Sequence, residues 1–291
     1  MTESTLSAAS VVAEAGGALP DEIYDAYLFD LDGTIYLGSE LLPGAKELIH
    51  NLRGKGAKTI FLSNNPTRDP GMYVSKLNDL GIPTKREEIL NTVVTTVLWL
   101  KQNHPDAVVF PIAEQPLINA LLDAGTKVST DPSEIDIVIA SYDRTFDYAK
   151  LQIAFDAIWQ HKRAFLITTN PDRYCPFPGG RGEPDAAGIV AAIEATTGTK
   201  CVANMGKPDT TMIETALAEI GVAAERTIMV GDRLETDVRM AVNAGMKSAL
   251  VLTGDSKLDD LEATNRAFWP TFVLESIGSL FPARERDLAT E

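Results

Sequence analysis

The chain has 291 residues, of which 45% are hydrophobic, and its formal net charge at pH 7 is −15. This acidity argues against nucleic acid as the main partner, because a phosphate backbone requires a basic footprint. An acidic protein can still bind small phosphorylated substrates, since a metal and one or two cationic side chains can neutralise their charge locally. No apolar run approaches the roughly 20 residues of a membrane span, so no membrane contact is expected.

The N-terminal residues and the cysteines indicate where the protein works. Residues 1–20 contain no Lys or Arg, so they lack the basic region of a secretory signal, and we predict a flexible tail there. Cys175 and Cys201 are the only cysteines. So few cysteines in a chain of this size indicate a reducing compartment rather than a disulfide scaffold, and we expect a cytoplasmic protein.

The first predicted strand, Ala26–Asp30, leads directly into Asp30-Leu31-Asp32-Gly33-Thr34. Residues i and i+2 of a strand point the same way, so Asp30 and Asp32 are expected to face one pocket. Two carboxylates this close repel unless a cation lies between them or one is protonated, and such hard oxygen ligands suit Mg²⁺. An ordinary solvated turn is the alternative interpretation of the same residues.

Along the rest of the chain, short apolar strands alternate with helices. We predict strands at Ala26–Asp30, Thr59–Ser63, Val108–Pro111, Ile135–Ala140, Ala164–Thr168, Thr227–Val230 and Ser248–Leu252. We predict helices at Gly44–Leu52, Pro70–Leu80, Thr92–Gln102, Gln115–Ala124, Tyr148–His161, Ala186–Thr197, Thr210–Ile220 and Thr236–Ala244. Glycines follow at the expected helix ends: Gly81, Gly125, Gly198, Gly221 and Gly245. This alternation predicts an α/β fold with parallel sheets covered on both faces.

Three further segments place polar residues where ligands bind in parallel sheets, beyond the carboxyl ends of strands. Residues 63–65, Ser-Asn-Asn, end the second strand, and Asp232, with Asp237 after it, follows the strand Thr227–Val230. Lys207 lies in a Gly-Lys-Pro segment just before a helix. Together with Asp30 these residues supply what phosphoryl transfer through an aspartate needs: a nucleophile, an acid/base, a phosphate cradle, a charge neutraliser and a metal site.

In this order, the segments resemble the four motifs of the haloacid dehalogenase (HAD) superfamily: Asp-x-Asp-Gly-Thr, a Ser or Thr ending a strand, a Lys, and Gly-Asp-x4-Asp. The long insertion before the Lys resembles the C2 cap of the class IIA phosphatases, which include bacterial sugar-phosphate and p-nitrophenyl phosphatases of the NagD type. The resemblance covers about Tyr24 to Phe281. It implies a Rossmann-like doubly wound core of residues 21–103 and 202–291 with an inserted α/β cap of residues 104–201.

The resemblance also implies a role for each matching residue. Asp30 is expected to be the nucleophile that takes the phosphoryl group. Asp32 is expected to protonate the leaving group and then to activate water. Lys207 is expected to neutralise the charge that develops.

Phosphate and metal binding follow from the same resemblance. Ser63, Asn64 and Asn65 are expected to hold the phosphate oxygens. Mg²⁺ is expected to bind Asp30, the backbone carbonyl of Asp32, and Asp232. Asp237 is expected not to bind the metal directly but to orient a metal-bound water or Lys207. Residue 66 departs from the family, which often has Ser or Thr there; here it is Pro66, which has no N–H to offer a phosphate.

In class IIA enzymes, a cap loop reaches over the active site and selects the substrate. The matching loop here runs from Pro171 to Pro184 and is rich in Pro and Gly. Candidate specificity residues in it are Asp172, Arg173, Tyr174, Cys175 and Arg181. An ordinary surface loop is the alternative interpretation.

These observations predict a cytoplasmic, Mg²⁺-dependent phosphomonoester hydrolase that acts on a sugar phosphate, glycerol phosphate or nucleotide monophosphate through an aspartyl-phosphate. One alternative is a phosphomutase or phosphotransferase on the same core, although residues 37–56, between the first two motifs, are too few for the cap that phosphomutases usually carry there. A catalytically silent metabolite-binding regulator is the other. The resemblance also implies a homodimer formed through the cap.

Overall fold

The computed structural model describes residues 19–177, 181–282 and 285, so the predicted tail lies almost wholly outside the described residues. The chain forms two compact units. The first comprises Met1–Leu62, Val74–Ile89 and Ala216–Glu291, and the second comprises Ser63–Tyr73 and Leu90–Thr215. The predicted core and cap boundaries, with a cap of residues 104–201, stay a prediction.

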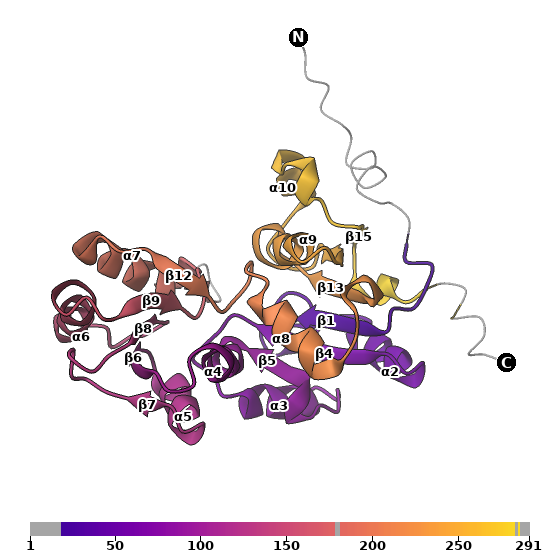
Figure 1. Ribbon diagram of the computed structural model, residues 1–291. Coiled ribbons are helices and arrows are strands. Elements are labelled where there is room, and N and C mark those ends of the chain that lie inside the picture. The colour runs from indigo at the N-terminus through magenta and orange to yellow at the C-terminus, as the bar shows by residue number, and fades with distance from the viewer. Residues whose placement is uncertain (1–18, 178–180, 283–284, 286–291) are drawn as a thin grey trace, which may run out of the picture. The chain divides into compact units, whose positions relative to one another are not determined.

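The first unit is built on a six-stranded sheet with the strand order β15-β14-β13-β1-β4-β5 (Figure 1). Its strands are β1 Ala26–Asp30, β4 Lys58–Ser63, β5 Ile89–Asn91, β13 Thr227–Gly231, β14 Lys247–Val251 and β15 Phe272–Leu274. Strand β1 pairs in parallel with both β4 and β13. The chain adds strands outward from β1 on one side and later outward from β13 on the other. The β1–β13 pair is therefore the topological switch point, where such sheets bind ligands.

Helices and short turns connect these strands. They are α2 Ala45–Gly54, α3 Pro70–Asp79, α8 Thr211–Ile220, α9 Arg239–Asn243, α10 Leu258–Ala263, η1 Arg86–Glu88, η4 Ala224–Arg226, η5 Leu234–Val238, η6 Arg266–Phe268 and η7 Ile277–Leu280. A short antiparallel hairpin, β2 Tyr36–Leu37 with β3 Glu40–Leu41, follows β1. Helix α2 forms because its apolar residues recur at helical spacing; Ala45, Leu48, Ile49 and Leu52 are all buried.

The second unit has its own parallel sheet with the strand order β12-β9-β8-β6-β7. Its strands are β6 Val108–Ile112, β7 Lys127–Val128, β8 Ile137–Ala140, β9 Phe165–Thr168 and β12 Cys201–Asn204. Its helices are α4 Thr92–Asn103, α5 Gln115–Asp123, α6 Tyr148–Phe155, η2 Asp156–Gln160 and α7 Ala186–Thr197.

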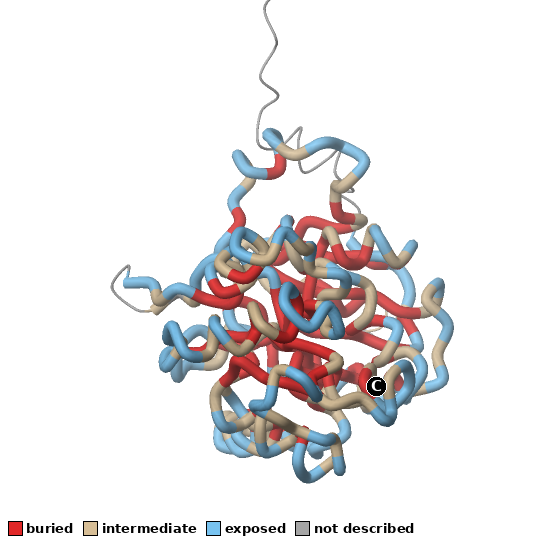
Figure 2. The backbone as a smooth tube through the Cα atoms, turned by 60° about the vertical axis from the view of Figure 1, so that its left-hand side comes forward, coloured by how far each residue is buried: buried red, intermediate tan, exposed pale blue. Residues whose placement is uncertain are grey.

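Both faces of this second sheet are covered. On β8, Val138 and Ala140 pack into a cluster with residues of α6 and α7, whereas Ile137 and Ile139 pack into another with residues of α4 and α5. Successive strand residues point to opposite faces, so a continuous apolar run serves two cores. All four residues of β8 are buried, and Figure 2 colours buried residues of the backbone red. The predicted parallel, doubly covered α/β architecture is confirmed.

Several elements differ from the predicted ones. The predicted helix Tyr148–His161 is α6 followed by the π-helical turn η2, and the predicted helix Thr236–Ala244 is the π-helical turn η5 followed by α9. The loop Pro171–Pro184 contains an antiparallel hairpin of β10 Tyr174–Pro176 and β11 Gly182–Pro184. The glycines predicted at helix ends all have positive φ, as that position requires.

No helix within the described ranges is both long enough and apolar enough to cross a membrane.

Candidate active site

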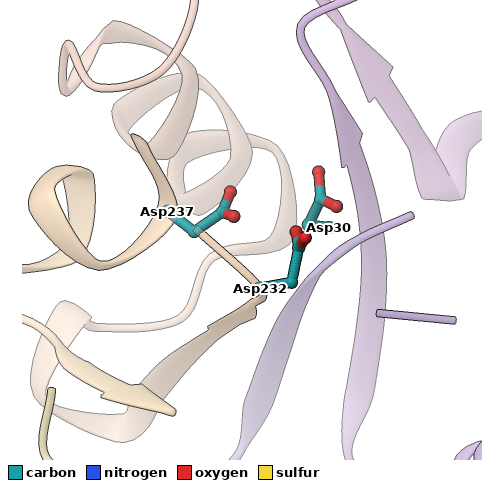
Figure 3. Close-up of side chains that lie close together, drawn as sticks. All are labelled: Asp30, Asp232 and Asp237. Carbon is teal, nitrogen blue, oxygen red and sulfur yellow. The ribbon is translucent and has the colours of Figure 1, made fainter. Parts of the chain in front are cut away.

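Three carboxylates of the first unit gather at the switch point. Asp30 ends β1, Asp232 follows β13, and Asp237 lies in η5; each offers an oxygen within 4.8 Å of the others (Figure 3). The register explains the meeting of the first two. Phe29 lies opposite Val230 in the parallel pair, so the next residues of both strands leave the sheet at the same edge.

The turn after Asp232 brings Asp237 back toward that edge. The backbone N–H of Arg233 donates a hydrogen bond of 3.1 Å to Asp237 Oδ2. This bond fixes the carboxylate within the first turn of η5. Asp237, which is 1% exposed, therefore lies beside Asp232 and Asp30, and its expected role in orienting a metal-bound water or Lys207 stays a prediction.

Glycines make the room that these carboxylates occupy. A Cβ at Gly33 would lie 2.5 Å from Asp232 Oδ2, and one at Gly254 would lie 1.9 Å from the same atom. A Cβ at Gly231 would lie 2.3 Å from the Asp237 side chain. Gly33 also has a φ of +84°, which favours glycine independently of space. The Gly of the Asp-x-Asp-Gly-Thr motif therefore serves both the turn and the neighbouring carboxylate.

Asp232 is the most constrained member of the cluster. It is 3% exposed, and its Oδ2 accepts a hydrogen bond of 2.7 Å from the backbone N–H of Asp255. Its Oδ1 is buried with no hydrogen-bond donor in the described part of the chain. Burial, and then the negative charges of Asp30 and Asp237, raise the pKa of Asp232 to about 7.

A divalent cation fits this arrangement. The ligand atoms are hard carboxylate oxygens, one of them buried and without a hydrogen-bond donor among the described residues, and a cation would offset the burial and the repulsion that together raise the Asp232 pKa. The carboxyl of Asp32 is not one of the three. Asp32 is exposed in the turn after β1, and the expected metal contact of its backbone carbonyl stays a prediction.

The predicted phosphate loop belongs to the second unit. Ser63, the last residue of β4, is 9% exposed; its Oγ lies 2.9 Å from the Tyr73 hydroxyl and accepts a bond of 3.2 Å from the Asn65 N–H. Asn65 Oδ1 accepts from both the N–H and the hydroxyl of Thr67, at 2.8 and 2.7 Å. The residues after β4 therefore form a tight turn held by its own side chains.

Asn64 connects this loop to two other candidates in the same unit. Its Oδ1 accepts from the Lys207 N–H at 2.8 Å, and its Nδ2 donates at 3.0 Å to both the Lys207 carbonyl and Asp172 Oδ2. Lys207 itself is 3% exposed. The structure thus brings together Asn64, Lys207 and Asp172, which lie far apart in the sequence.

The remaining cap-loop candidates lie on or beside the β10–β11 hairpin. Arg173 and Tyr174 are exposed, and Cys175 is partly buried. Arg181 forms an ion pair of 2.5 Å with Glu183 and is largely exposed, so it already has an anionic partner.

Glu183 anchors this hairpin to the rest of its unit. Its Oε2 accepts a hydrogen bond of 2.5 Å from the hydroxyl of the buried Tyr142, and Arg144 lies 3.7 Å from the same oxygen. The hairpin is therefore fixed at its base while Arg173 and Tyr174 stay open to solvent.

Sequence reasoning missed the loop after β14. Gly254 makes room for Asp232, and the N–H groups of Asp255 and Ser256 donate to its side chain and its backbone carbonyl. The rule that ligands bind beyond the carboxyl ends of strands could have found this loop. Residues 253–255, Thr-Gly-Asp, directly follow the predicted apolar strand Ser248–Leu252, as Gly-Asp follows the predicted strand Thr227–Val230.

The sequence matches known families over much of its length. Residues 27–127 match the family described as haloacid dehalogenase-like hydrolase, and residues 204–280 match one described as HAD-hydrolase-like. The matched segments contain Asp30 in the first case and Asp232 in the second.

Individual relatives agree with these families. The chain is 37% identical to the sugar-phosphatase AraL of Bacillus subtilis over 86% of this chain and 89% of that protein. It is 32% identical to an acid sugar phosphatase of Staphylococcus aureus over 90% and 99%. The structure is similar to that of the 4-nitrophenylphosphatase of Thermotoga maritima, with a TM-score of 0.82, 33% identity and coverage of 88% and 96%. It is also similar to NagD from E. coli K-12, with a TM-score of 0.79, 26% identity and coverage of 88% and 98%.

Proposed function

Since the chain belongs to the haloacid dehalogenase-like hydrolases and is a phosphatase of small phosphorylated substrates, we propose that Asp30 is its nucleophile and that Mg²⁺ is its metal. The observation that carries the proposal is the meeting of Asp30, Asp232 and Asp237 at the switch point of the first sheet. A nucleophile at that point stands where ligands of doubly wound sheets bind. Burial and the neighbouring carboxylates raise the pKa of Asp232, and a bound cation would favour its ionised form.

The reaction proceeds in two steps. An Asp30 carboxylate oxygen attacks the phosphorus of the ester, the bond to the leaving oxygen breaks, and Asp32 gives that oxygen a proton. Asp32, now ionised, takes a proton from water, which attacks the aspartyl-phosphate and releases inorganic phosphate. The exposure of Asp32 supports this role, because a group that exchanges protons with water has to reach it.

Asp30 and Asp232 would hold Mg²⁺, with Asp237 beside them and the Asp32 carbonyl as the expected backbone ligand. When bound, the cation supplies positive charge that offsets the charge of the transferring phosphoryl group. Lys207 supplies a second positive charge, and Ser63 with its loop binds the phosphate oxygens. Both Nδ2 hydrogens of Asn64 and the backbone N–H of Asn65 already donate within the chain, so the side-chain amide of Asn65 is the donor of this pair that we propose for the phosphate.

The substrate is proposed to be a sugar phosphate, glycerol phosphate or nucleotide monophosphate. The names of the sugar-phosphatase relatives support the first of these. The exposed Arg173 and Tyr174 at the hairpin, with Asp172 at its base, are the residues we propose to select the leaving group. A panel of phosphorylated metabolites ranked by kcat/KM identifies the preferred class. We also propose a cytoplasmic location, supported by the presence of only two cysteines in the sequence, and a homodimer formed through the cap.

The nucleophile is tested by replacing Asp30 with Asn and measuring hydrolysis of p-nitrophenyl phosphate with Mg²⁺. We expect Asp30→Asn to lose at least about 10³-fold in kcat, because an amide cannot form the acyl phosphate. Asp123→Asn, an exposed change at the end of α5, is the matched control and is expected to keep full activity. Wild-type turnover in Asp30→Asn would overturn the assignment.

Metal removal provides an independent test. EDTA is expected to abolish turnover, and Mg²⁺ in excess is expected to restore it. Unchanged activity after exhaustive chelation would contradict the metal assignment. The same assay separates the alternatives: a phosphomutase would retain phosphate in an organic product, and a silent regulator would release no phosphate.

A further inference from the structure

Asn64 has all of its side-chain donors engaged within the second unit. One Nδ2 hydrogen goes to the Lys207 carbonyl and the other to Asp172 Oδ2, both at 3.0 Å, while Oδ1 accepts the Lys207 N–H at 2.8 Å. An amide has two N–H donors, so both are used. The Asn64 carbonyl also accepts from Thr92 Oγ1 at 3.0 Å, which ties this residue to the start of α4.

The two bonds to Lys207 form a clamp on one residue's backbone. Donor and acceptor of Lys207 are both engaged by the same planar amide, which fixes the position of its backbone more firmly than either bond alone. The preceding Gly206 is equally confined, because a Cβ there would lie 2.8 Å from Asn64 Oδ1 and 2.8 Å from the Thr169 carbonyl. A side chain before Lys207 would therefore push the clamp apart.

The third bond connects the clamp to the cap loop. Asp172 Oδ2 also accepts from Asn170 Nδ2 at 3.0 Å, and the same Nδ2 donates to Asp185 Oδ1 at 3.0 Å. Asp185 is the N-cap of α7, where it accepts from the Ala186 N–H. The path from Asn64 therefore runs through Asp172 to both ends of the hairpin segment.

We propose that Asn64 is a positioning residue, which holds Lys207 by its backbone and couples that position to Asp172 at the base of the hairpin. The inference rests on the proposed function, since it assumes that Lys207 acts in phosphoryl transfer. Its consequence is specific: a change at Asn64 lowers kcat through Lys207, although Asn64 side-chain donors touch no substrate. A displacement of about 1 Å at a catalytic group costs on the order of 10²-fold in rate.

The test uses p-nitrophenyl phosphate, Mg²⁺ and full-length variants, each measured well below its own unfolding temperature. Asn64→Ala is expected to lower kcat by about 10- to 100-fold with little change in KM. Asn64→Asp keeps the side-chain shape and the oxygen that accepts the Lys207 N–H. It also places a second carboxylate against that of Asp172, so we expect a loss of kcat of similar size. The double variant Asn64→Asp, Asp172→Asn again has an amide donor facing a carboxylate at these two positions. Its kcat is expected to be severalfold higher than that of Asn64→Asp.

Asn78 provides the matched control. Its Oδ1 accepts from the Thr84 N–H at 2.9 Å and its Nδ2 donates to the Thr84 carbonyl at 3.4 Å, which is the same kind of clamp within the first unit. Asn78→Ala is expected to lower the unfolding temperature without changing kcat. If Asn64 had a purely structural role, its variants would also lower the unfolding temperature without changing kcat. The double variant Asn64→Asp, Asp172→Asn would then show no recovery of kcat.

Lys207→Ala separates failure of the inference from failure of the proposed function. If Lys207→Ala keeps wild-type kcat, the role of Lys207 is wrong. If Lys207→Ala is inactive while Asn64→Ala and Asn64→Asp keep wild-type kcat, only the positioning role is overturned.

Discussion

At the scale of single residues, Asp232 combines burial, hydrogen bonding and charge in one carboxyl group. One oxygen is held by the Asp255 N–H, and the other is buried without a donor in the described structure. Burial and the neighbouring carboxylates raise its pKa to about 7. A group in this state destabilises the metal-free fold when it ionises and becomes a strong ligand when a cation is present.

This pKa predicts a pH dependence of metal-free stability. The folded pKa lies above the ordinary value of 3.8, so the folded state holds the proton more tightly than the unfolded state. The stabilisation from Asp232 is therefore fully present at low pH and is lost as the pH rises through about 7. In EDTA, urea unfolding of the wild type is expected to lose stability as the pH rises from about 4 to about 7, relative to Asp232→Asn. Identical pH dependence in the two proteins would contradict the assigned cause.

The residue types of the site were predictable, but their surroundings were not. The order of Asp30, Ser63, Lys207 and Asp232 along the chain was enough to predict a phosphoryl-transfer site. The hydrogen bonds of Asn64 could not be foreseen, because they join residues more than a hundred positions apart. Nothing local in the sequence distinguishes an amide that binds phosphate from one that clamps a backbone.

At the scale of elements, the turns after strands create the site. The turn after β1 depends on Gly33, which has a φ of +84° and lies against Asp232. The hairpin turn that follows depends on Gly38, which has a φ of +60° but no atom within 4 Å of a Cβ placed there. The two positions thus share a backbone requirement and differ in their contact with the acidic cluster.

This difference predicts separate effects of two alanine substitutions. Gly38→Ala is expected to cost about 1 kcal/mol of stability from backbone strain and to keep activity. Gly33→Ala adds a methyl group 2.5 Å from Asp232 Oδ2 and is expected to weaken Mg²⁺ activation at least about tenfold. Titration of activity with Mg²⁺, together with urea unfolding, measures both effects. Equal Mg²⁺ requirements in the two variants would show that the contact with Asp232 is unimportant.

Periodicity predicted most strands and helices but not their irregular parts. The π-helical turns η2 and η5 keep apolar residues at near-helical spacing, so the sequence shows no break there. The strands β10 and β11 have three residues each, among Pro and Gly, and show no clear alternation. Glu183 of β11 also accepts a hydrogen bond from Tyr142, which lies 41 positions away and outside any local pattern.

At the scale of the whole molecule, each unit contains its own parallel sheet, as the alternation of strands and helices predicted. The boundaries of the compact units fall inside continuous elements: they divide β4 after Leu62, α3 after Tyr73, β5 after Ile89 and α8 after Thr215. Sequence reasoning places boundaries in linkers, so it could not predict divisions within a strand or a helix.

Metal binding is expected to stabilise the folded chain as a whole. A ligand at 100 times its Kd adds about 2.7 kcal/mol when it binds only the folded state. Mg²⁺ is therefore expected to raise the unfolding temperature of the wild type and of Asp123→Asn, but not that of Asp232→Asn, which lacks a charged ligand. Thermal unfolding with and without Mg²⁺ measures the shift. An equal shift in Asp232→Asn would place the stabilising metal elsewhere.

The most direct measurement is to locate the phosphoryl group on the enzyme. In Asp32→Asn, p-nitrophenolate leaves readily without a proton, whereas hydrolysis of the aspartyl-phosphate lacks its base, so phosphoenzyme is expected to accumulate. Rapid acid quenching and mass spectrometry of the peptides should find a single phosphoryl group on Asp30, and none in the Asp30→Asn, Asp32→Asn double variant. Phosphate on another residue, or turnover of Asp32→Asn without any covalent phosphate in its first cycle, would contradict Asp30 as the nucleophile.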